Sequence, residues 1–444
     1  MKVNFFNLIA FNSVTIFALY IFMFIIYPEN SNYFQCNVLT SNISRSLELT
    51  YLIPVSCDLE VYMVGVNDFS SIVEFDYNYQ TRPLYILSIK FIYIILSKLI
   101  GDILILEFMS FLVFHLFITT FSILIVLKCI PSFQDKRASL IYLISGLIIL
   151  NPIIRYGLFD SAHQTLTLLT FAGSLYFLTQ KPFSSSKLYL YALIIGLLSM
   201  ANVSIVLSTI FLLYNKIKKI NQVIQNFSNI LITFILVAAP KILWNFYISS
   251  KGFIPYNSAT QYWHQFVWIK DFILANYENV DYNLSEGGYY CMSVPLFVKC
   301  YLLDFFKTII YLSLPILTIF ANFYALHKRK TPLIYGYLKN LLLILALLFS
   351  FWAFIGWYPP LRFNLYSIGY FVTLMLCIQF SYLPRDGKFL MAYISVLIYY
   401  LFLPHWNYLE ILKLNLGIIV SYILFVIYIL KIYKENKKST SSSL

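Results

Sequence analysis

Long apolar runs separated by short polar connectors make up most of the chain. A hydrocarbon core about 30 Å thick needs roughly 20 apolar residues per crossing helix, and helices satisfy their own backbone groups there. We therefore predict an all-α polytopic membrane protein. It has about twelve transmembrane helices, over residues 4–27, 103–127, 138–157, 165–180, 188–200, 202–215, 228–249, 301–325, 337–357, 365–383, 389–403 and 411–432.

Two of these helices, 188–200 and 202–215, are short. We expect them to form a hairpin that begins and ends on the inner side of the membrane. The first run, 4–27, is too long for the core of a signal peptide, and no small-residue cleavage site follows it. It is predicted to be retained as the first span.

Residues 83–100 are apolar but carry Lys90 and Lys98. If this segment crossed the membrane, the lysine-rich connector 128–137 would lie outside, against the positive-inside bias. We therefore predict that residues 84–99 form an amphipathic helix on the outer surface, with both lysines reaching the headgroups. Both chain termini then lie inside.

The distribution of charge supports this topology. The predicted inner side holds 18 of the 31 basic residues, but of the 19 acids it holds only Asp135, Asp386 and Glu435. This asymmetry accounts for the net charge of +12 without a nucleic-acid partner. A chain that is 60% hydrophobic and 11% charged also lies outside the range of soluble globular proteins. The six cysteines show no spacing typical of a zinc site.

The predicted organisation has three parts. A transmembrane module covers residues 1–380, with long outer loops at 28–102 and 250–300. A helical hairpin follows at 381–432. The last residues, 433–444, are basic and serine-rich and are expected to be a disordered cytoplasmic tail.

The outer loop at 28–102 gathers polar residues that are rare elsewhere. It contains the run Asp58-Leu59-Glu60-Val61-Tyr62 and, where the loop returns to the membrane, Arg82-Pro83-Leu84-Tyr85. Asp58 and Glu60 share a face if the chain is extended and lie about 200° apart if it is helical. The pattern indicates a site, and the alternative is a solvated acidic loop.

These two runs resemble the first outer loop of the C-type membrane glycosyltransferases, in the branch of the protein O-mannosyltransferases and lipid A aminoarabinose transferases. That family has a second acid at the outer end of the third span, where Asp160 stands here, 102 residues after Asp58. The run from Trp357 to Tyr366 is similar to the family's late basic segment. The sequence departs from the pattern because Leu59 splits the acid pair and Leu84 replaces a proline.

The resemblance implies transfer of a sugar from a polyprenyl-phosphate donor to a lipid, glycan or protein acceptor at the extracytoplasmic face. Asp58 would be the base, while Glu60 or Asp160 would orient the acceptor or hold a divalent cation. Arg82 and Arg362 would bind phosphate. Further expected substrate contacts are Tyr62, Tyr85, His163 and Lys241.

Structural roles are the alternative for several of these residues. Asp160 and His163 would then cap the helix that starts near residue 165. Arg362 would be an interfacial anchor. Lys241 lies near the middle of a predicted span, where a charge is costly, so it is expected to face the protein interior or a cavity. His115, also within a span, is expected to hydrogen-bond between helices.

Two other functions remain open. A polysaccharide polymerase or ligase of the cell envelope would also use arginine-bearing outer loops, but with a lipid diphosphate-linked oligosaccharide as donor. A lipid-sugar flippase or transporter would keep its ionisable residues near the membrane midplane on broken helices. Because the tail lacks an evident retention signal, we expect a bacterial plasma membrane rather than an endoplasmic reticulum.

Overall fold

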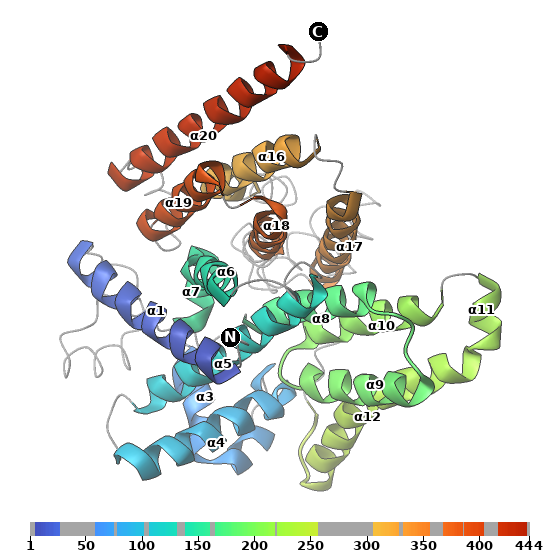
Figure 1. Ribbon diagram of the computed structural model, residues 1–444. Coiled ribbons are helices and arrows are strands. Elements are labelled where there is room, and N and C mark those ends of the chain that lie inside the picture. Colours follow the sequence, from blue (N-terminus) through green and yellow to red (C-terminus); the bar gives the residue numbers. More distant parts are fainter. Residues whose placement is uncertain are drawn as a thin grey trace, which may run out of the picture. The chain divides into compact units, whose positions relative to one another are not determined.

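The computed structural model is entirely helical in the part of the chain that it describes (Figure 1). No strand occurs in that part, so the predicted all-α class is confirmed there. The described residues are 5–26, 58–74, 78–101, 106–130, 138–159, 165–217, 220–255, 305–327, 332–355, 367–384, 386–403 and 416–441.

The helices form two compact units, each built from separate stretches of the chain. The first unit takes residues 1–19, 130–156 and 265–444, and the second takes residues 20–129 and 157–264. The first holds most of α1 (Phe5–Ile26), α6 (Ala138–Leu150), most of α7 (Pro152–Phe159), α16 (Ser313–His327), α17 (Pro332–Ile355), α18 (Gly369–Tyr382), α19 (Gly387–Phe402) and α20 (Leu416–Ser441).

The second unit contains the polar segment singled out in the sequence. Its elements are α3 (Asp58–Asn67), η2 (Phe69–Val73), η3 (Asn78–Thr81), α4 (Pro83–Ile100), α5 (Leu106–Cys129), α8 (Thr165–Thr179), α9 (Ser185–Ser199), η5 (Val203–Leu207), α10 (Ser208–Lys216), α11 (Ile220–Gln225) and α12 (Phe227–Ser250).

Helices α5 and α8 pack side by side and run in the same direction. His115 Nδ1 lies 2.5 Å from Thr165 Oγ1, at the first residue of α8. At the other end, the hydroxyl of Thr179 lies beside the thiol of Cys129, where both helices stop. This parallel arrangement agrees with the predicted topology, in which both helices run inward.

Helices α9 and α12 are also parallel and approach each other closely. The Tyr189 hydroxyl donates to Asn229 Oδ1 at 2.7 Å, and Gly196 lies against the backbone of Leu236 and Val237. A Cβ atom at Gly196 would stand only 2.7 Å from the Val237 carbonyl oxygen. Close backbone contact at a small residue is typical of helix pairs in membranes.

The predicted short hairpin is present as α9 followed by η5 and α10. Its two ends meet, because Lys216 Nζ donates to the Phe183 carbonyl at 3.3 Å. The amide of Asn215 also donates to the Gln180 carbonyl, just beyond the end of α8, at 2.9 Å. At the tip, Ser204 Oγ lies 3.0 Å from Thr170 Oγ1 of α8.

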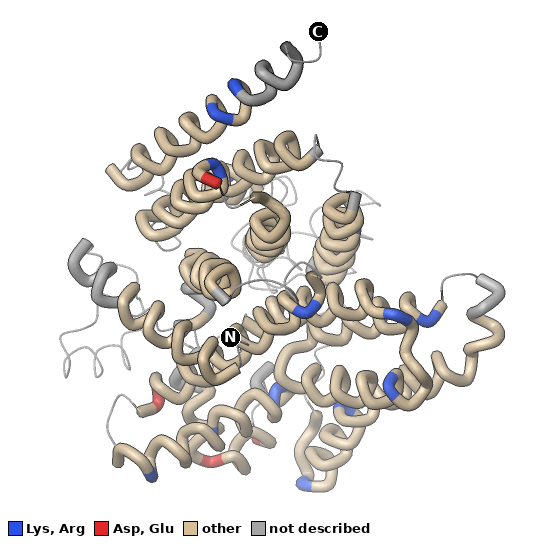
Figure 2. Tube along the Cα trace, viewed as in Figure 1, with Lys and Arg blue, Asp and Glu red and all other residues tan. Residues whose placement is uncertain are grey.

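Lysines mark the end of the second unit where these helices meet (Figure 2). They are Lys128 at the end of α5, Lys181 after α8, Lys187 at the start of α9 and Lys216 at the end of α10. The sequence places all four on the inner side. Their common location agrees with that prediction.

A buried polar network joins three helices of the first unit. The Tyr428 hydroxyl of α20 donates to Asn322 Oδ1 of α16 at 2.6 Å, and Asn322 Nδ2 donates to Gln379 Oε1 of α18 at 3.2 Å. Gln379 Nε2 donates in turn to the Ile319 carbonyl at 3.0 Å. Side-chain hydrogen bonds of this kind hold helices together where water is absent.

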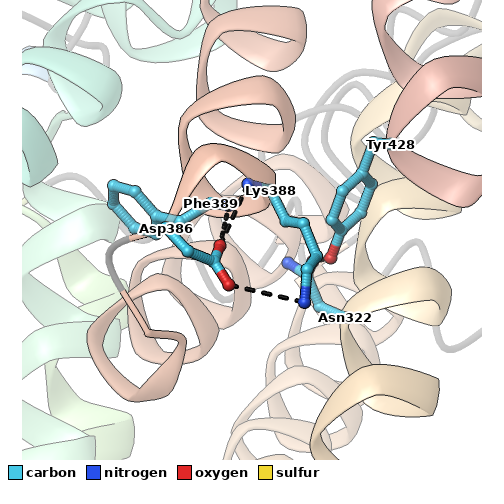
Figure 3. Close-up of polar contacts among 5 residues, drawn as sticks. All are labelled: Asn322, Asp386, Lys388, Phe389 and Tyr428. Carbon is cyan, nitrogen blue, oxygen red and sulfur yellow. Dashed lines mark hydrogen bonds and ion pairs between the residues drawn. The ribbon is translucent and has the colours of Figure 1, made fainter. Parts of the chain in front are cut away.

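Asp386 caps the start of α19 beside this network (Figure 3). Its carboxylate accepts the backbone N–H groups of Lys388 and Phe389 at 2.9 and 3.0 Å. Partial burial alone would raise the pKa of Asp386, but the Phe389 N–H and the charge of Lys388 outweigh it, so the pKa is lowered. The carboxylate therefore stays charged and stabilises the hairpin between α18 and α19.

Three predicted boundaries are corrected. The expected span 138–157 breaks at Asn151, because Pro152 cannot donate a helical hydrogen bond and Asn151 Oδ1 instead accepts the Ile153 N–H at 2.8 Å. The span 301–325 bends by 69° between residues 311 and 313. Helix α20 continues to Ser441, where a disordered tail was expected from 433; lysine and glutamate there are good helix formers.

Five helices among the described residues are long and apolar enough to cross a membrane, or six if the bent pair at 305–326 is one span. Further apolar helices of 10 to 17 residues accompany them. These are the helices of an all-α membrane protein, and the number of crossings stays a prediction. The five are Pro83–Ile100, Met109–Cys129, Phe227–Ser250, Leu333–Phe351 and Leu416–Lys434.

Helix α4 is one of these five, although the sequence places it on the outer surface. The surface location of α4 therefore stays a prediction. Tyr85, in the first turn of α4, packs on Phe111 and Phe114 near the start of α5. The start of α4 therefore lies against the first half of α5.

Cysteine labelling would test the location of α4. In a variant freed of accessible native cysteines, Lys90→Cys should react with a membrane-impermeant maleimide added to intact cells. Lys187→Cys, on the predicted inner side, should react only after permeabilisation. Labelling of Lys90→Cys from the inner side alone would contradict the topology.

Candidate functional site

The structure brings together the two runs of the outer loop that the sequence singled out. Asp58 begins α3, and Tyr62 follows one helical turn later. Arg82 immediately precedes α4, with Pro83 in the first helical position. The Arg82 guanidinium donates a hydrogen bond to the Tyr62 hydroxyl. A tyrosine and an arginine separated by twenty residues of chain are thus joined.

Helix α3 also distinguishes between the two neighbouring acids. Because the segment is helical, positions 58 and 60 lie about 200° apart around its axis, whereas positions 58 and 62 differ by about 40°. Along the helical backbone, position 58 is therefore in register with position 62, and position 60 is not. The extended geometry, in which the two acids would form a pair, does not occur.

We call the region where Arg82 meets Tyr62, at the start of α4, the Arg82 corner. Tyr62 and Tyr85 pack against each other beneath it. Their ring centroids are 5.0 Å apart in an edge-to-face arrangement, and both side chains are 0% exposed. The Tyr85 hydroxyl lies 3.0 Å from His115 Nε2. In this structure the two tyrosines, which were expected to contact substrate, pack inside the protein. Arg82 is half-buried and is the charged member of the corner.

Helix α12 is tied to the same corner. Trp244 Nε1 donates to the Gln80 carbonyl at 2.8 Å, and the Gln80 amide donates to the Val73 carbonyl at 2.8 Å. Lys241 lies one turn before Trp244 and is also half-buried. The structure thus places Lys241 and Arg82 on two segments that a single hydrogen bond connects.

Asp68 has a structural role in this region. It caps η2, where Oδ1 accepts from the Ser70 hydroxyl at 2.5 Å and from the Ser70 N–H at 2.9 Å. The hydroxyl bond, followed by the backbone bond, lowers the pKa of Asp68. These contacts account for the carboxylate without any ligand.

The remaining expected site residues, Asp160, His163 and Arg362, lie outside the described residues. The segment with Asp160 and His163 ends at Thr165, which contacts His115. In the described part of the chain, no three His, Cys, Asp or Glu residues are grouped to hold a metal ion. A divalent cation therefore stays an expectation that involves Asp58, Glu60 and Asp160.

Of two hydrogen-bonded connections at the Arg82 corner, the sequence predicted one and missed the other. His115 hydrogen-bonds between α4 and α8, as its position within a span indicated. The bond from Trp244 to Gln80 was missed, because a tryptophan near the end of a span is common at membrane interfaces and carries no sign of its partner.

Comparison with known proteins adds no relative: no protein-family model, no curated protein and no solved structure matches the chain. The class that the fold defines is an all-α protein with the apolar helices of a membrane protein.

Proposed function

We propose that the protein is a membrane glycosyltransferase that uses a polyprenyl-phosphate sugar at the extracytoplasmic face. The supporting observation is the Arg82 corner: a half-buried guanidinium, bonded to Tyr62, beside the helix that Asp58 begins. The transfer requires a base for the acceptor hydroxyl and a cation for the phosphate, and Asp58 and Arg82 are the groups proposed for these two roles. The acceptor is a lipid, a glycan or a protein, and the membrane is a bacterial plasma membrane.

The chemistry assigns a role to each group. Asp58 takes the proton of the acceptor hydroxyl while the acceptor oxygen bonds to the anomeric carbon of the sugar. The bond from that carbon to the phosphate oxygen breaks, and the polyprenyl phosphate leaves as an anion. Arg82 binds phosphate oxygens through its planar fork. Lys241 adds a second positive charge from α12.

The residues outside the described part complete this proposal. Arg362 would bind the phosphate together with Arg82. Asp160 or Glu60 would orient the acceptor or hold a divalent cation, and His163 would contact the substrate. Because position 60 is about 200° from position 58 on a helix, Asp160 is the better candidate for orienting the acceptor.

One observation favours a second candidate, a lipid-sugar flippase. The helix pair over residues 305–326 is bent by 69°, and broken helices are typical of transporters. The break is nevertheless satisfied inside the protein, since the Tyr399 hydroxyl donates to the Tyr311 carbonyl at 3.0 Å. The site chemistry therefore ranks transfer first.

Arg82→Ala should raise the KM for the donor by about 10- to 100-fold, because a hydrogen-bonded charge on the phosphate is lost. Arg82→Lys keeps the charge, so its KM for the donor should lie between those of Arg82→Ala and the wild type. The measurement is transfer by purified protein in nanodiscs, with a radiolabelled polyprenyl-phosphate sugar. The control, Lys98→Ala, removes an exposed cation from the far end of α4.

Each alternative function predicts a different result in this assay. Unchanged donor dependence in Arg82→Ala would remove Arg82 from the phosphate site. Transfer only from lipid diphosphate-linked oligosaccharides would identify a polymerase or ligase. Movement of the lipid across a vesicle membrane without any transfer would identify a flippase.

A further inference from the structure

His115 connects three elements at the candidate site. His115 belongs to α5, and its imidazole is fully buried. Nε2 lies 3.0 Å from the Tyr85 hydroxyl of α4, and Nδ1 lies 2.5 Å from Thr165 Oγ1 of α8. A neutral imidazole has one donor and one acceptor nitrogen, so a single ring satisfies both partners.

The contact with Tyr85 extends to Arg82 through one further side chain. The ring of Tyr85, held by His115, packs edge-on against Tyr62 at 5.0 Å and 77°. Phe111 and Phe114 contact the other sides of Tyr85, with centroids at 6.1 and 5.3 Å. Because protein interiors are close-packed, these rings cannot move independently. The orientation of the Tyr62 hydroxyl, which accepts from Arg82, is thereby fixed.

We propose that His115 is a positioning residue, which holds the Arg82 guanidinium in place through Tyr85 and Tyr62. The contacts run from Thr165 at the start of α8 to Arg82 at the start of α4, through residues that are buried except at the Arg82 end. A long side chain loses considerable freedom when it binds a ligand. Fixing Arg82 beforehand lowers that cost, so phosphate binds more tightly. The effect on phosphate rests on the proposed function, whereas the effect on Arg82 itself does not.

The two nitrogens of His115 can be tested separately. An asparagine amide reaches about as far as Nδ1, so His115→Asn keeps the bond to Thr165 and loses the bond to Tyr85. A glutamine amide reaches about as far as Nε2, so His115→Gln keeps the bond to Tyr85. Tyr85→Phe removes the hydroxyl alone and keeps the aromatic packing. If His115 had only a general structural role, loss of the Tyr85 bond in His115→Asn and Tyr85→Phe would not affect Arg82 more than His115→Gln does.

The first measurement needs no substrate. Full-length protein in nanodiscs is treated with phenylglyoxal, and modification of the Arg82 peptide is followed by mass spectrometry. His115→Asn and Tyr85→Phe should each increase the modification rate of Arg82 by about tenfold, the effect of one net hydrogen bond. The double variant should be no faster, because both changes break the same bond. His115→Gln should stay within about twofold of the wild type.

The matched control is Thr119→Val, one turn further along α5. Thr119 is also fully buried, and among the described residues its hydroxyl has no hydrogen-bond partner. This variant should leave Arg82 modification unchanged. Equal modification in the wild type, His115→Asn and Tyr85→Phe would overturn the proposal. An equal increase in all variants, Thr119→Val included, would also overturn it, because general loosening would then explain the result.

The second measurement uses farnesyl phosphate and farnesol as probes. The wild type should bind farnesyl phosphate more tightly than farnesol, and His115→Asn should weaken only the phosphate probe, by about tenfold. If the wild type binds both probes equally, the phosphate site of the proposed function fails. The phenylglyoxal result then still decides whether His115 positions Arg82.

Discussion

Replacing Asp58 with asparagine should lower the rate of sugar transfer by about 10²- to 10⁴-fold, the usual contribution of a general base. Asparagine has nearly the same shape and is an equally good residue at a helix start, so α3 should form normally. The rate is measured with saturating polyprenyl-phosphate sugar and acceptor. The loss should appear in kcat, because the proton moves only in the transition state.

Asp68→Asn is the control for this experiment. Asp68 belongs to the same acidic segment, but its carboxylate is bonded to Ser70. Because asparagine also caps helices and Asp68 has no role in the proposed transfer, this variant should stay folded, with kcat within about twofold of the wild type. If Asp58→Asn transferred sugar at the wild-type rate, the proposed base would be excluded. Equal losses in both variants would point to folding rather than catalysis.

Gly196→Ala should destabilise the second unit by about 1–3 kcal/mol, the usual cost of overpacking. The added Cβ would stand 2.7 and 2.8 Å from the carbonyl oxygens of Val237 and Leu236. These are backbone atoms of α12 and cannot turn aside as a side chain can. The bond between Tyr189 and Asn229 also fixes the register of the two helices. The measurement is the fraction of protein that stays monodisperse after heating in detergent.

Gly336→Ala provides the comparison. Gly336 also lies within an apolar helix, but no atom stands within 4 Å of its Cβ position. Alanine there should leave stability unchanged or raise it by up to about 1 kcal/mol, because alanine is the better helix former. If the two variants lost stability equally, α9 and α12 would not be in backbone contact.

The sequence predicted the fold well where one local signal was sufficient. Apolar length located most helices, including the helix predicted over 84–99, which is α4 at Pro83–Ile100. The same criterion failed at the break beside Pro152, because a count of apolar residues does not register a missing N–H. It also failed at α20, which continues past the apolar run into charged residues that favour helix.

The candidate site was predictable only in part. The composition of the outer loop and a family resemblance indicated Asp58 and Arg82. The contacts that hold Arg82 were not visible, because Tyr85, His115 and Thr165 are separated by 30 and 50 residues of chain. The geometry of the two acids was also open, since the choice between strand and helix over so short a run depends on what it packs against.

The shortness of α9 has a consequence for how a substrate arrives. Its 15 residues rise about 22 Å, less than the thickness of a bilayer core, about 30 Å. Helix α12 extends beyond the tip of that hairpin, and Leu243 and Phe246 there are each 68% exposed. A polyprenyl tail can lie along this flank while it stays dissolved in lipid. For the proposed transferase, supply to the Arg82 corner would then depend on the mole fraction of the donor within the leaflet, as a search in two dimensions, and not on its concentration in water.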